Sequence, residues 1–298
     1  MCELERILSD AHVDYKRNIK LSTVSSFRIG GEADYMVLPD TAEKLVTTLR
    51  TLKNNGIRFA VVGNTSNVLF SDSRFEGAIV ITKKIADISF EGNIAVCGCG
   101  AMLPVLSLRA AEFSLSGVEF ACGIPATLGG AVFMNAGAHG GEMSDVIKKI
   151  TVYDIGNDKL IGLSSSECGF SYRHSILADN PDWVCLGATI ALSEGENEEI
   201  KAKMKGFSDK RKATQPLDKP SAGSFFKRPE GYFAARLIDE CGLKGYRVGG
   251  ACVSEKHAGF IVNLGGATCA DVLALAEYVS ERVFDMTGVR LEREVRVI

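Results

Sequence analysis

The sequence predicts a protein of mixed helices and strands, built as two domains or as one large domain with subdomains, and three observations support this prediction. The chain has 298 residues, which is more than one hydrophobic core usually organises. Segments with helical periodicity and segments with strand periodicity are mixed along it. Near its middle, residues 122–145 are rich in glycine and alanine, and residues 123–141 contain no lysine or arginine. Such small side chains bury little area, so this stretch cannot form a core by itself.

The first two thirds of the chain are expected to mix strands and helices. Residues 41–55 show the clearest helix, because its leucines recur on one face and Asp40 or Thr41 can cap its start. Gly56 can end this helix. The other expected elements are a surface helix within 1–20, strands at 35–38, 57–62, 78–82, 94–97, 147–155 and 183–192, and a helix at 102–113.

After residue 192 the composition changes, and the acidic segment 193–200 marks an expected domain boundary. A helix is expected at 197–212, followed by an irregular segment at 211–229 that contains three prolines. Thr268 and Asp271 form a capping box for a helix that runs to about residue 286. The remaining expected elements are a short helix at 231–241, a strand at 258–264 and a final alternating strand at 289–298.

The charge balance argues against a nucleic-acid-binding protein. The net charge is −3, whereas nucleic-acid-binding domains carry a basic face. No apolar run reaches the ~18 residues that a membrane span needs, and the N-terminus lacks the apolar segment of a signal peptide. We therefore expect a cytoplasmic protein with neither a nucleic-acid partner nor a membrane partner.

The nine cysteines are expected to be buried free thiols in a reducing compartment. Their number is odd, they are scattered from Cys2 to Cys269, and no C-x-x-C occurs. Cys97 and Cys99 are the one close pair, and no histidine lies near them in the sequence. We therefore expect no metal site.

Two segments are candidates for binding a phosphate through their backbone. Glycines in 123–141 let backbone N–H groups approach an anion, and the turn G-N-T-S-N at 63–67 follows an expected strand. On composition alone, a tight interdomain turn explains the first segment equally well, and an ordinary polar turn explains the second better. The lone G-C-G at 98–100 lacks the rest of the dinucleotide fingerprint and no P-loop sequence occurs, so both of those folds are rejected.

Seven motifs, in order, resemble those of the UDP-N-acetylenolpyruvoylglucosamine reductases (MurB type). They are S-S-F-R-I-G-G, V-V-G-N-T-S-N-V-L-F-S-D, G-I-P-A-T-L-G-G-A-V-F-M-N-A-G, Y-R-H-S, S-A-G-S-F-F-K-R-P, K-H-A-G-F-I-V-N and L-E-R-E-V-R. The resemblance implies an FAD-binding module of the p-cresol-methylhydroxylase type at 1–195, with α+β subdomains at about 1–75 and 76–195. A smaller α+β substrate-binding domain is expected at 196–298. The short connecting segments resemble the subfamily that lacks an extra tyrosine loop.

The resemblance also implies FAD as cofactor and NADPH as co-substrate. Two positions differ from the usual family pattern, since Thr65 and Ala126 stand where glycine is common. The residues expected to bind the cofactor lie in the two candidate segments and are Gly63, Asn64, Thr65, Ser66, Asn67, Gly123, Ile124, Pro125, Ala126, Gly129, Gly130, Asn135, Ala136 and Gly137.

The implied reaction reduces the enolpyruvyl ether of UDP-N-acetylglucosamine enolpyruvate to a lactyl ether, a step of peptidoglycan precursor synthesis. Arg173 is expected to hold the substrate carboxylate, because a guanidinium is a planar fork that keeps its charge. Ser224 is expected to donate the proton, and Glu294 to assist as the third catalytic group. Outside their motifs these residues are typical of a surface arginine, a turn serine and a solvated carboxylate.

The nucleotide-sugar substrate carries a diphosphate, which needs cationic and hydrogen-bonding partners. The positions that match the family's substrate site are Tyr172, Arg211, Gln215, Lys227, Arg228 and His257. We expect the protein to act on this small molecule as a monomer.

Two other functions remain open from the sequence. The first is an FAD-dependent oxidase or dehydrogenase of the same flavin fold that acts on an alcohol or a sugar. The second is a protein that binds flavin or a UDP-sugar without catalysis. Reduction of the flavin by NADPH, followed by reoxidation by the enolpyruvyl substrate, would separate the three.

Overall fold

The computed structural model describes residues 3–298, which form two compact units whose segments alternate along the chain. The first unit contains the segments up to residue 17, 35–64 and 77–210, and the second contains 18–34, 65–76 and 211–298. Each unit has its own cluster of buried apolar side chains. Cys2, one of the expected buried thiols, lies outside the described residues.

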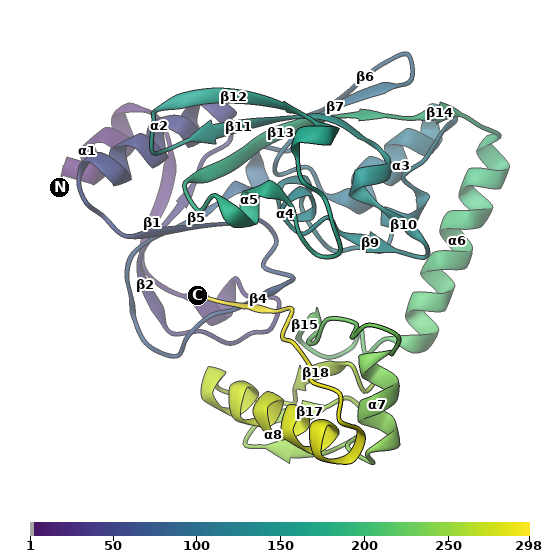
Figure 1. The fold of residues 1–298 in the computed structure, drawn as a ribbon. Coiled ribbons are helices and arrows are strands. Elements are labelled where there is room, and N and C mark those ends of the chain that lie inside the picture. The colour runs from purple at the N-terminus through teal and green to yellow at the C-terminus, as the bar shows by residue number, and fades with distance from the viewer. Residues whose placement is uncertain (1–2) are drawn as a thin grey trace. The chain divides into compact units, whose positions relative to one another are not determined.

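A five-stranded antiparallel sheet forms the centre of the first unit (Figure 1). Its order is β12 (Lys159–Ser164), β11 (Ile147–Asp154), β13 (Trp183–Ala191), β7 (Ile94–Gly98) and β6 (Ile88–Glu91). Helix α3 (Leu103–Glu112) and the short helices α4 (Leu128–Phe133) and α5 (Ile176–Asp179) complete this part. The expected strands at 94–97, 147–155 and 183–192 are thereby confirmed.

A second sheet has the order β1 (Asp14–Lys20), β2 (Glu32–Leu38), β5 (Phe75–Ile81) and β3 (Phe59–Val62). Strands β3 and β5 run parallel. Helix α2 (Ala42–Asn54) begins where expected, because the Thr41 hydroxyl accepts a hydrogen bond from the Lys44 nitrogen at 3.2 Å. It ends before Gly56, whose φ of +62° suits glycine.

In the second unit a four-stranded sheet packs against α8 (Cys269–Thr287). The sheet order is β15 (Ser221–Ser224), β18 (Phe260–Asn263), β17 (Ala251–Val253) and β16 (Arg247–Val248). The predicted capping box of Thr268 and Asp271 is confirmed, and so is the buried stripe of α8, Val272, Leu275, Val279 and Val283. Helix α7 (Ala234–Glu240) and the parallel pair β4 (Val68–Leu69) and β19 (Arg296–Val297) also belong to this unit.

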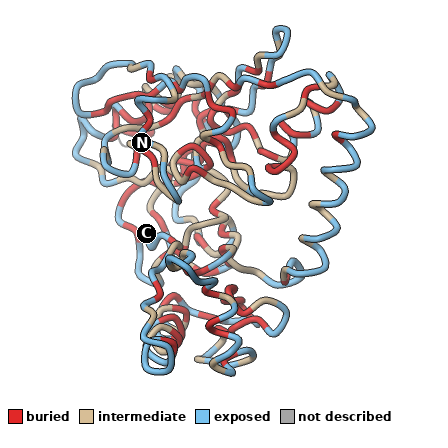
Figure 2. The backbone as a smooth tube through the Cα atoms, turned by 45° about the vertical axis from the view of Figure 1, so that its right-hand side comes forward, coloured by how far each residue is buried: buried red, intermediate tan, exposed pale blue. Residues whose placement is uncertain are grey.

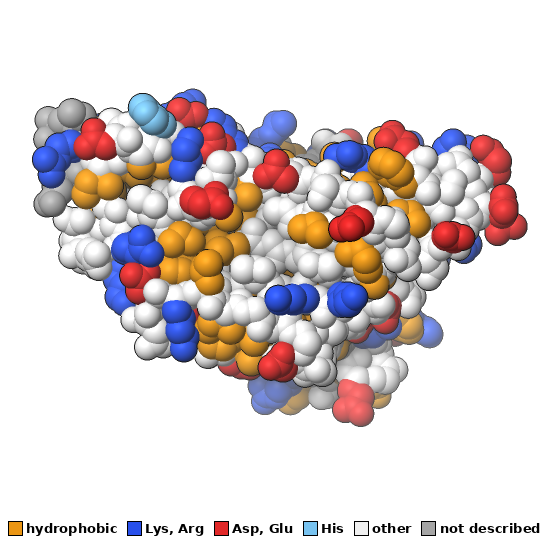
Figure 3. Space-filling model, turned by 90° about the horizontal axis from the view of Figure 1, so that it is seen from above, with side chains coloured by type: hydrophobic (Ala, Val, Ile, Leu, Met, Phe, Trp, Pro, Cys, Tyr) orange, Lys and Arg blue, Asp and Glu red, His pale blue; other side chains and the backbone are white. Residues whose placement is uncertain are grey.

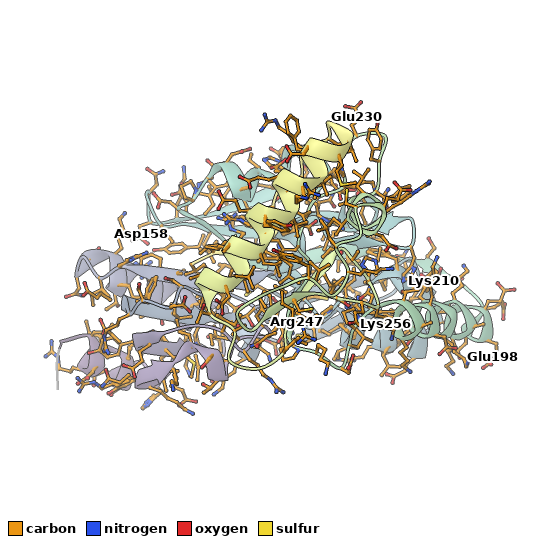
Figure 4. The ribbon with its side chains drawn as sticks, turned by 90° about the horizontal axis from the view of Figure 1, so that it is seen from below. Asp158, Glu198, Lys210, Glu230, Arg247 and Lys256 are labelled. Carbon is orange, nitrogen blue, oxygen red and sulfur yellow. The ribbon has the colours of Figure 1, made fainter. Side chains whose placement is uncertain are left out.

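The other elements are short, apart from one long helix. They are α1 (Glu3–Asp10), β8 (Leu115–Ser116), β9 (Gly137–Ala138), β10 (Gly141–Glu142), β14 (Ser193–Glu194) and α6 (Asn197–Thr214). Most of α6 is exposed, with only Ile200 buried (Figure 2). Glu198 and Lys210 mark its opposite ends in Figure 4.

Three expectations about secondary structure are wrong. The helix expected in residues 1–20 is confirmed only at α1, whereas residues 14–20 form a strand, β1, which pairs with β2 in spite of its many charges. The segment 211–229 is only partly irregular, since α6 continues to Thr214 and β15 forms between two of the prolines. The final strand shrinks to β19; on its expected apolar face Leu291 and Val295 are buried, whereas Val297 is 36% exposed.

None of the eight described cysteines forms a disulfide; six are buried as expected, whereas Cys122 and Cys241 are half-buried. Burial raises the pKa of Cys97 and of Cys99 to about 12. Within residues 3–298, no group of three or more potential metal ligands occurs, and no helix has the length and apolar character of a membrane span. On the face seen in Figure 3, apolar side chains form separate groups between charged and polar ones. Scattered apolar groups of this kind are normal on a protein surface.

Candidate active site

The turn that follows β3 presents three consecutive backbone N–H groups in the second unit. The nitrogens of Thr65, Ser66 and Asn67 donate to no acceptor within residues 3–298. Thr65 has a φ of +57°, in the left-handed region. Successive N–H groups around such a residue form a concave anion-binding nest. The geometry of this turn therefore suits a phosphate.

In the first unit, the start of the same turn is tied to the glycine-rich segment. The Asn64 side chain donates from Nδ2 to the carbonyl oxygen of Pro125 at 2.7 Å. A Cβ on Gly63 would overlap Oγ1 of Thr127, so only glycine fits there. Residues 122–126 remain partly exposed beside this contact. The structure thus brings Gly63 and Asn64 together with residues 123–127.

The first turn of helix α4 is hydrogen-bonded to the loop that follows β7. The nitrogens of Leu128 and Gly129 donate to the carbonyl oxygens of Ala101 and Cys99, both at 2.8 Å. A Cβ on Gly129 would lie 3.1 Å from Cβ of Cys99, so this backbone contact is close. Gly130 is exposed.

The sequence N-A-G at 135–137 follows α4, and its asparagine is completely buried. Asn135 is 0% exposed, and its amide makes hydrogen bonds to Glu142, Ser144 and Ser171. Ala136 and Gly137 are half-buried, and a Cβ on Gly137 would lie 2.7 Å from the Gly141 oxygen across the β9–β10 pair. The side chain of Asn135 is therefore closed to a ligand, whereas Ala136 and Gly137 stay partly exposed.

Arg173 lies at the corner of a tight turn in the first unit. A β-bridge joins Ser171 and His174, and Arg173 between them has a φ of +56°. Its guanidinium donates from Nη2 to the Gly137 oxygen at 3.4 Å and lies 5.1 Å from the ring centroid of Tyr172. Tyr172 is 49% exposed. The turn thus directs the Arg173 guanidinium toward Gly137, with the ring of Tyr172 beside it.

Ser224 and Glu294 lie close together in the second unit. Strand β15 pairs with β18 through Ser221–Val262 and Ser224–Phe260, so one extra residue stands between the two pairs. Gly223, with a φ of +78°, permits this bulge, which turns Ser224 outward to an exposed position. The nitrogen of Glu294 donates to the Phe225 oxygen at 2.9 Å. The two expected catalytic residues therefore sit on neighbouring backbone segments.

The cationic residues after β15 are also in the second unit. Lys227 forms an ion pair with Glu292, with Nζ 2.5 Å from Oε1, and its backbone nitrogen donates to the Glu292 oxygen. Arg228 is exposed and lies over the ring of Phe233 at 4.7 Å. Arg211 occupies the last turn of α6, and its oxygen accepts from the Gln215 nitrogen at 2.9 Å.

His257 is half-buried and neutral near neutral pH. Burial lowers the pKa of His257, and its Nδ1 accepts a hydrogen bond from the Gly259 nitrogen at 3.2 Å. The ring proton therefore belongs on Nε2. This histidine can donate one hydrogen bond to an oxygen atom, whereas a cationic contribution would need a lower pH.

Two family models match parts of this chain. Residues 33–164 match the family described as FAD binding domain, and residues 215–298 match the C-terminal domain of UDP-N-acetylenolpyruvoylglucosamine reductase. The chain is 45% identical over 296 residues to the UDP-N-acetylenolpyruvoylglucosamine reductase of Caldanaerobacter subterraneus subsp. tengcongensis. That alignment covers 99% of this chain and 97% of the relative. The chain belongs to the UDP-N-acetylenolpyruvoylglucosamine reductase family.

Two further comparisons place the chain within this reductase family over its whole length. The enzyme of that name from Clostridium novyi is 45% identical, with 99% of this chain and 95% of the relative covered. The crystal structure of the Thermus caldophilus reductase (MurB) superposes with a TM-score of 0.81 at 36% identity, covering 96% and 98% of the two chains. The predicted α+β fold, an FAD-binding module followed by a C-terminal domain, is confirmed.

The fold of the FAD-binding part is also found outside the reductase family. Berberine bridge enzyme from Eschscholzia californica matches with a TM-score of 0.50 at 14% identity, over 65% of this chain and 44% of that chain. A likeness at this identity shows a shared fold and nothing about the chemistry.

Sequence reasoning missed three residues that the structure places beside the expected site. Thr127 contacts Gly63, Glu142 contacts Asn135, and Glu292 pairs with Lys227. A signal existed for Glu142, which is the first charged residue in an otherwise neutral stretch. Glu292 gave no signal, because a carboxylate on an alternating strand is typical of a solvated face.

Proposed function

We propose that this chain catalyses the NADPH-dependent reduction of UDP-N-acetylglucosamine enolpyruvate to UDP-N-acetylmuramate, with FAD as cofactor. Membership of the reductase family over the full chain is the observation that carries the proposal. The reaction belongs to peptidoglycan precursor synthesis, and so to cell-wall formation. It adds a hydride to the terminal vinyl carbon and a proton to the carbon that bears the carboxylate.

The described residues fit FAD at two places. The N–H groups of residues 65–67 offer a nest for a phosphate, and the exposed backbone of residues 123–126 lies beside Gly63 and Asn64. We propose that the expected cofactor residues in these segments hold FAD mainly through their backbone. When bound, FAD supplies hydride transfer from NADPH to the substrate.

Arg173 is proposed to bind the substrate carboxylate. Charge develops on this carboxylate and the adjacent carbon once hydride has been added, so a fixed cation there stabilises the transition state. The guanidinium suits this role because it offers paired N–H donors and stays charged at every working pH. Tyr172, in contact with Arg173, is proposed to line the same part of the substrate site.

Ser224 is proposed to donate the proton that completes the reaction. A hydroxyl is a weak acid in water, so the donation requires a strongly basic carbon and a position in direct contact with it. The bulge at Gly223 supports this proposal, because it exposes the Ser224 hydroxyl. Glu294, on the neighbouring segment, is proposed to assist protonation.

The substrate diphosphate is proposed to bind Arg211, Lys227 and Arg228, with Gln215 and His257 as hydrogen-bonding partners. Lys227 is the best supported of these, because its ammonium already holds a carboxylate oxygen at 2.5 Å. A phosphate oxygen would satisfy the same donor.

We also propose the domain roles expected above: an FAD-binding module at 1–195, from which Tyr172 and Arg173 also contact the substrate, and a substrate-binding domain at 196–298. A cytoplasmic location follows from the supply of NADPH and nucleotide sugars there, and the protein is proposed to act as a monomer.

A reconstitution assay tests the proposed function. Apoprotein is titrated with FAD, and the loaded protein is then mixed with NADPH and UDP-N-acetylglucosamine enolpyruvate. The proposal predicts NADPH consumption that requires the enolpyruvyl substrate, and a product heavier by two hydrogens in mass spectrometry. NADPH consumption that is equally fast without this substrate would refute the proposed function.

A further inference from the structure

We infer that Asn135 is a positioning residue for Arg173: its buried amide fixes the turn that presents the guanidinium. This inference rests on the proposed function, in which Arg173 binds the substrate carboxylate. In the sequence, Asn135 was expected to bind the cofactor because it lies in the N-A-G motif. The contacts of its side chain support a different role.

The amide of Asn135 uses its hydrogen-bonding capacity within the protein. Nδ2 donates to Oε1 of Glu142 at 2.9 Å and to the backbone oxygen of Ser171 at 3.1 Å. Oδ1 accepts from the nitrogen of Ser144 at 2.9 Å. Both N–H groups and the oxygen of the side chain are thus occupied, and the residue is 0% exposed. No surface of this side chain is available to a ligand.

The bond to Ser171 acts on the turn that carries Arg173. Ser171 and His174 are joined as a β-bridge, and Arg173 between them has a left-handed φ of +56°. A residue with a side chain adopts such a backbone at a cost of about 1–2 kcal/mol. The turn keeps this conformation only if surrounding contacts fix it. Asn135 supplies one such contact from outside the turn.

Two other contacts hold the far end of the same turn. The Ser175 hydroxyl donates to the Phe133 oxygen at 2.9 Å, and the ring of His174 lies 3.0 Å from Oδ1 of Asp179. Ser175 and Asn135 thus connect the turn to both ends of the segment 133–135. Because Asn135 also binds Glu142 and Ser144, it links the turn to the β9–β10 hairpin and the residues after it.

A misplaced guanidinium should affect one half-reaction selectively. Hydride transfer from NADPH does not involve the substrate carboxylate, whereas reoxidation by the enolpyruvyl substrate does. A displacement of about 1 Å can lower a rate about 100-fold. Loss of the Asn135 contact should therefore slow substrate-driven reoxidation far more than NADPH-driven reduction.

The test compares both half-reactions by stopped-flow absorbance on FAD-loaded protein. Asn135→Ala is expected to slow reoxidation about 10–100-fold, with a much smaller effect on reduction. The double variant, Asn135→Ala with Arg173→Lys, should be reoxidised less than about 3-fold more slowly than Arg173→Lys alone, because both changes act on one interaction. The inference would be overturned if Asn135→Ala slowed reduction and reoxidation by the same factor. It would also be overturned if the slowing of reoxidation in the double variant equalled the product of the two single effects.

A second variant removes the Ser171 contact and keeps the bond between positions 135 and 142. In the pair Asn135→Asp with Glu142→Gln, the donor and acceptor between these two positions exchange roles, and the Ser144 nitrogen keeps its acceptor. The donation to the Ser171 oxygen is lost, and the Ser144 hydroxyl, which donates to Oε1 of Glu142, has to accept from the new amide instead. Glu142→Gln alone is the control for the Ser144 change, and the pair should slow reoxidation selectively beyond it even if Asn135→Ala fails to fold.

Asn93→Ala is the matched control, since Asn93 donates from Nδ2 to the Leu192 oxygen at 3.0 Å in the same unit. Hydrogen–deuterium exchange gives a readout without turnover: residues 171–175 should exchange faster in the Asn135 variants and not in the control. Unchanged exchange there would contradict the inference. Wild-type protein that is not reoxidised by the substrate would instead refute the proposed function.

Discussion

The hydroxyl of Thr65 lies 3.0 Å from the backbone nitrogen of Ser26, whose hydrogen bond it accepts. The same hydroxyl donates to the Val24 oxygen at 3.2 Å and lies 3.2 Å from the Ser26 hydroxyl. Thr65 has a φ of +57°, a backbone conformation that glycine adopts without strain. Here the hydroxyl contacts offset the strain that glycine would avoid.

Replacement of Thr65 should therefore lower stability in a defined order. Thr65→Gly removes the strain of about 1–2 kcal/mol and also loses hydrogen bonds worth about 1 kcal/mol each, so a loss of about 1 kcal/mol or more is expected. Thr65→Val keeps the strain and loses the hydrogen bonds, so it should be the least stable. Urea unfolding of the apoproteins measures this order, and a glycine variant as stable as wild type would contradict it.

Ser224→Ala should abolish protonation of the reduced substrate. We expect the rate of flavin reoxidation by the enolpyruvyl substrate to fall about 100-fold or more, because general acids contribute about that much. Stopped-flow absorbance separates this step from reduction by NADPH. Ser221→Ala, at the other end of β15, is the control. The assignment fails if both half-reactions slow by the same factor.

Arg173→Lys should be severe although the charge is retained. An ammonium cannot offer the paired donors of a guanidinium, so kcat/KM for the enolpyruvyl substrate is expected to fall about 100-fold. Arg50→Lys is a suitable control, because Arg50 forms a paired contact with Asp158, labelled in Figure 4, at 2.9 and 3.0 Å from Nε. Near-wild-type kinetics for Arg173→Lys would remove this residue from the site.

Glu292→Gln should tighten substrate binding. Glu292 occupies the ammonium of Lys227, so its carboxylate competes with the substrate diphosphate proposed to bind there. Its side chain is 72% exposed, and such a pair contributes less than about 1 kcal/mol to stability. We expect KM for the nucleotide sugar to fall about 2- to 5-fold, because breaking an exposed ion pair of this strength frees less than about 1 kcal/mol of binding energy.

The matched control for this variant is Asp239→Asn, which breaks the exposed pair with Lys244 at 2.6 Å in the same unit. A KM that rises for Glu292→Gln, or falls equally in the control, would show that the ion pair does not compete with substrate.

His257 should make stability depend on pH. Burial lowers the pKa of His257 in the folded protein, so the unfolded chain binds the proton more readily. The stabilisation is complete above the unfolded pKa of about 6.5 and is lost as the pH falls toward the folded value. In His257→Asn, the unfolding free energy should fall less steeply below about pH 6.5. If the unfolding free energy of both proteins fell equally steeply with falling pH, His257 would not be the source of this pH dependence.

The sequence predicted the local elements better than the contacts between them. Helix α2 and the Thr268 capping box depend on neighbouring residues, so their start signals are visible in the sequence. Strand β1 was missed because most of its residues are exposed, so no apolar alternation marks it in the sequence. Two units of alternating segments could not be predicted, because they depend on contacts between residues that are far apart in the chain.

In the candidate site, too, the sequence predicts the residue types better than the contacts between them. The residue types of Arg173, Ser224 and Glu294 could be chosen by resemblance to a family. The bulge at Gly223 and the burial of Asn135 could not, because each depends on long-range packing. An asparagine in a glycine-rich stretch is typical of a ligand contact, and only the geometry reveals its internal bonds.

The most direct test of the central claim is a sequential stopped-flow experiment on the FAD-loaded protein. NADPH is added first without oxygen, and the flavin colour should disappear. UDP-N-acetylglucosamine enolpyruvate is added next, and the colour should return as UDP-N-acetylmuramate forms in equal amount. Colour that NADPH removes but the enolpyruvyl substrate does not restore would contradict this account of the protein.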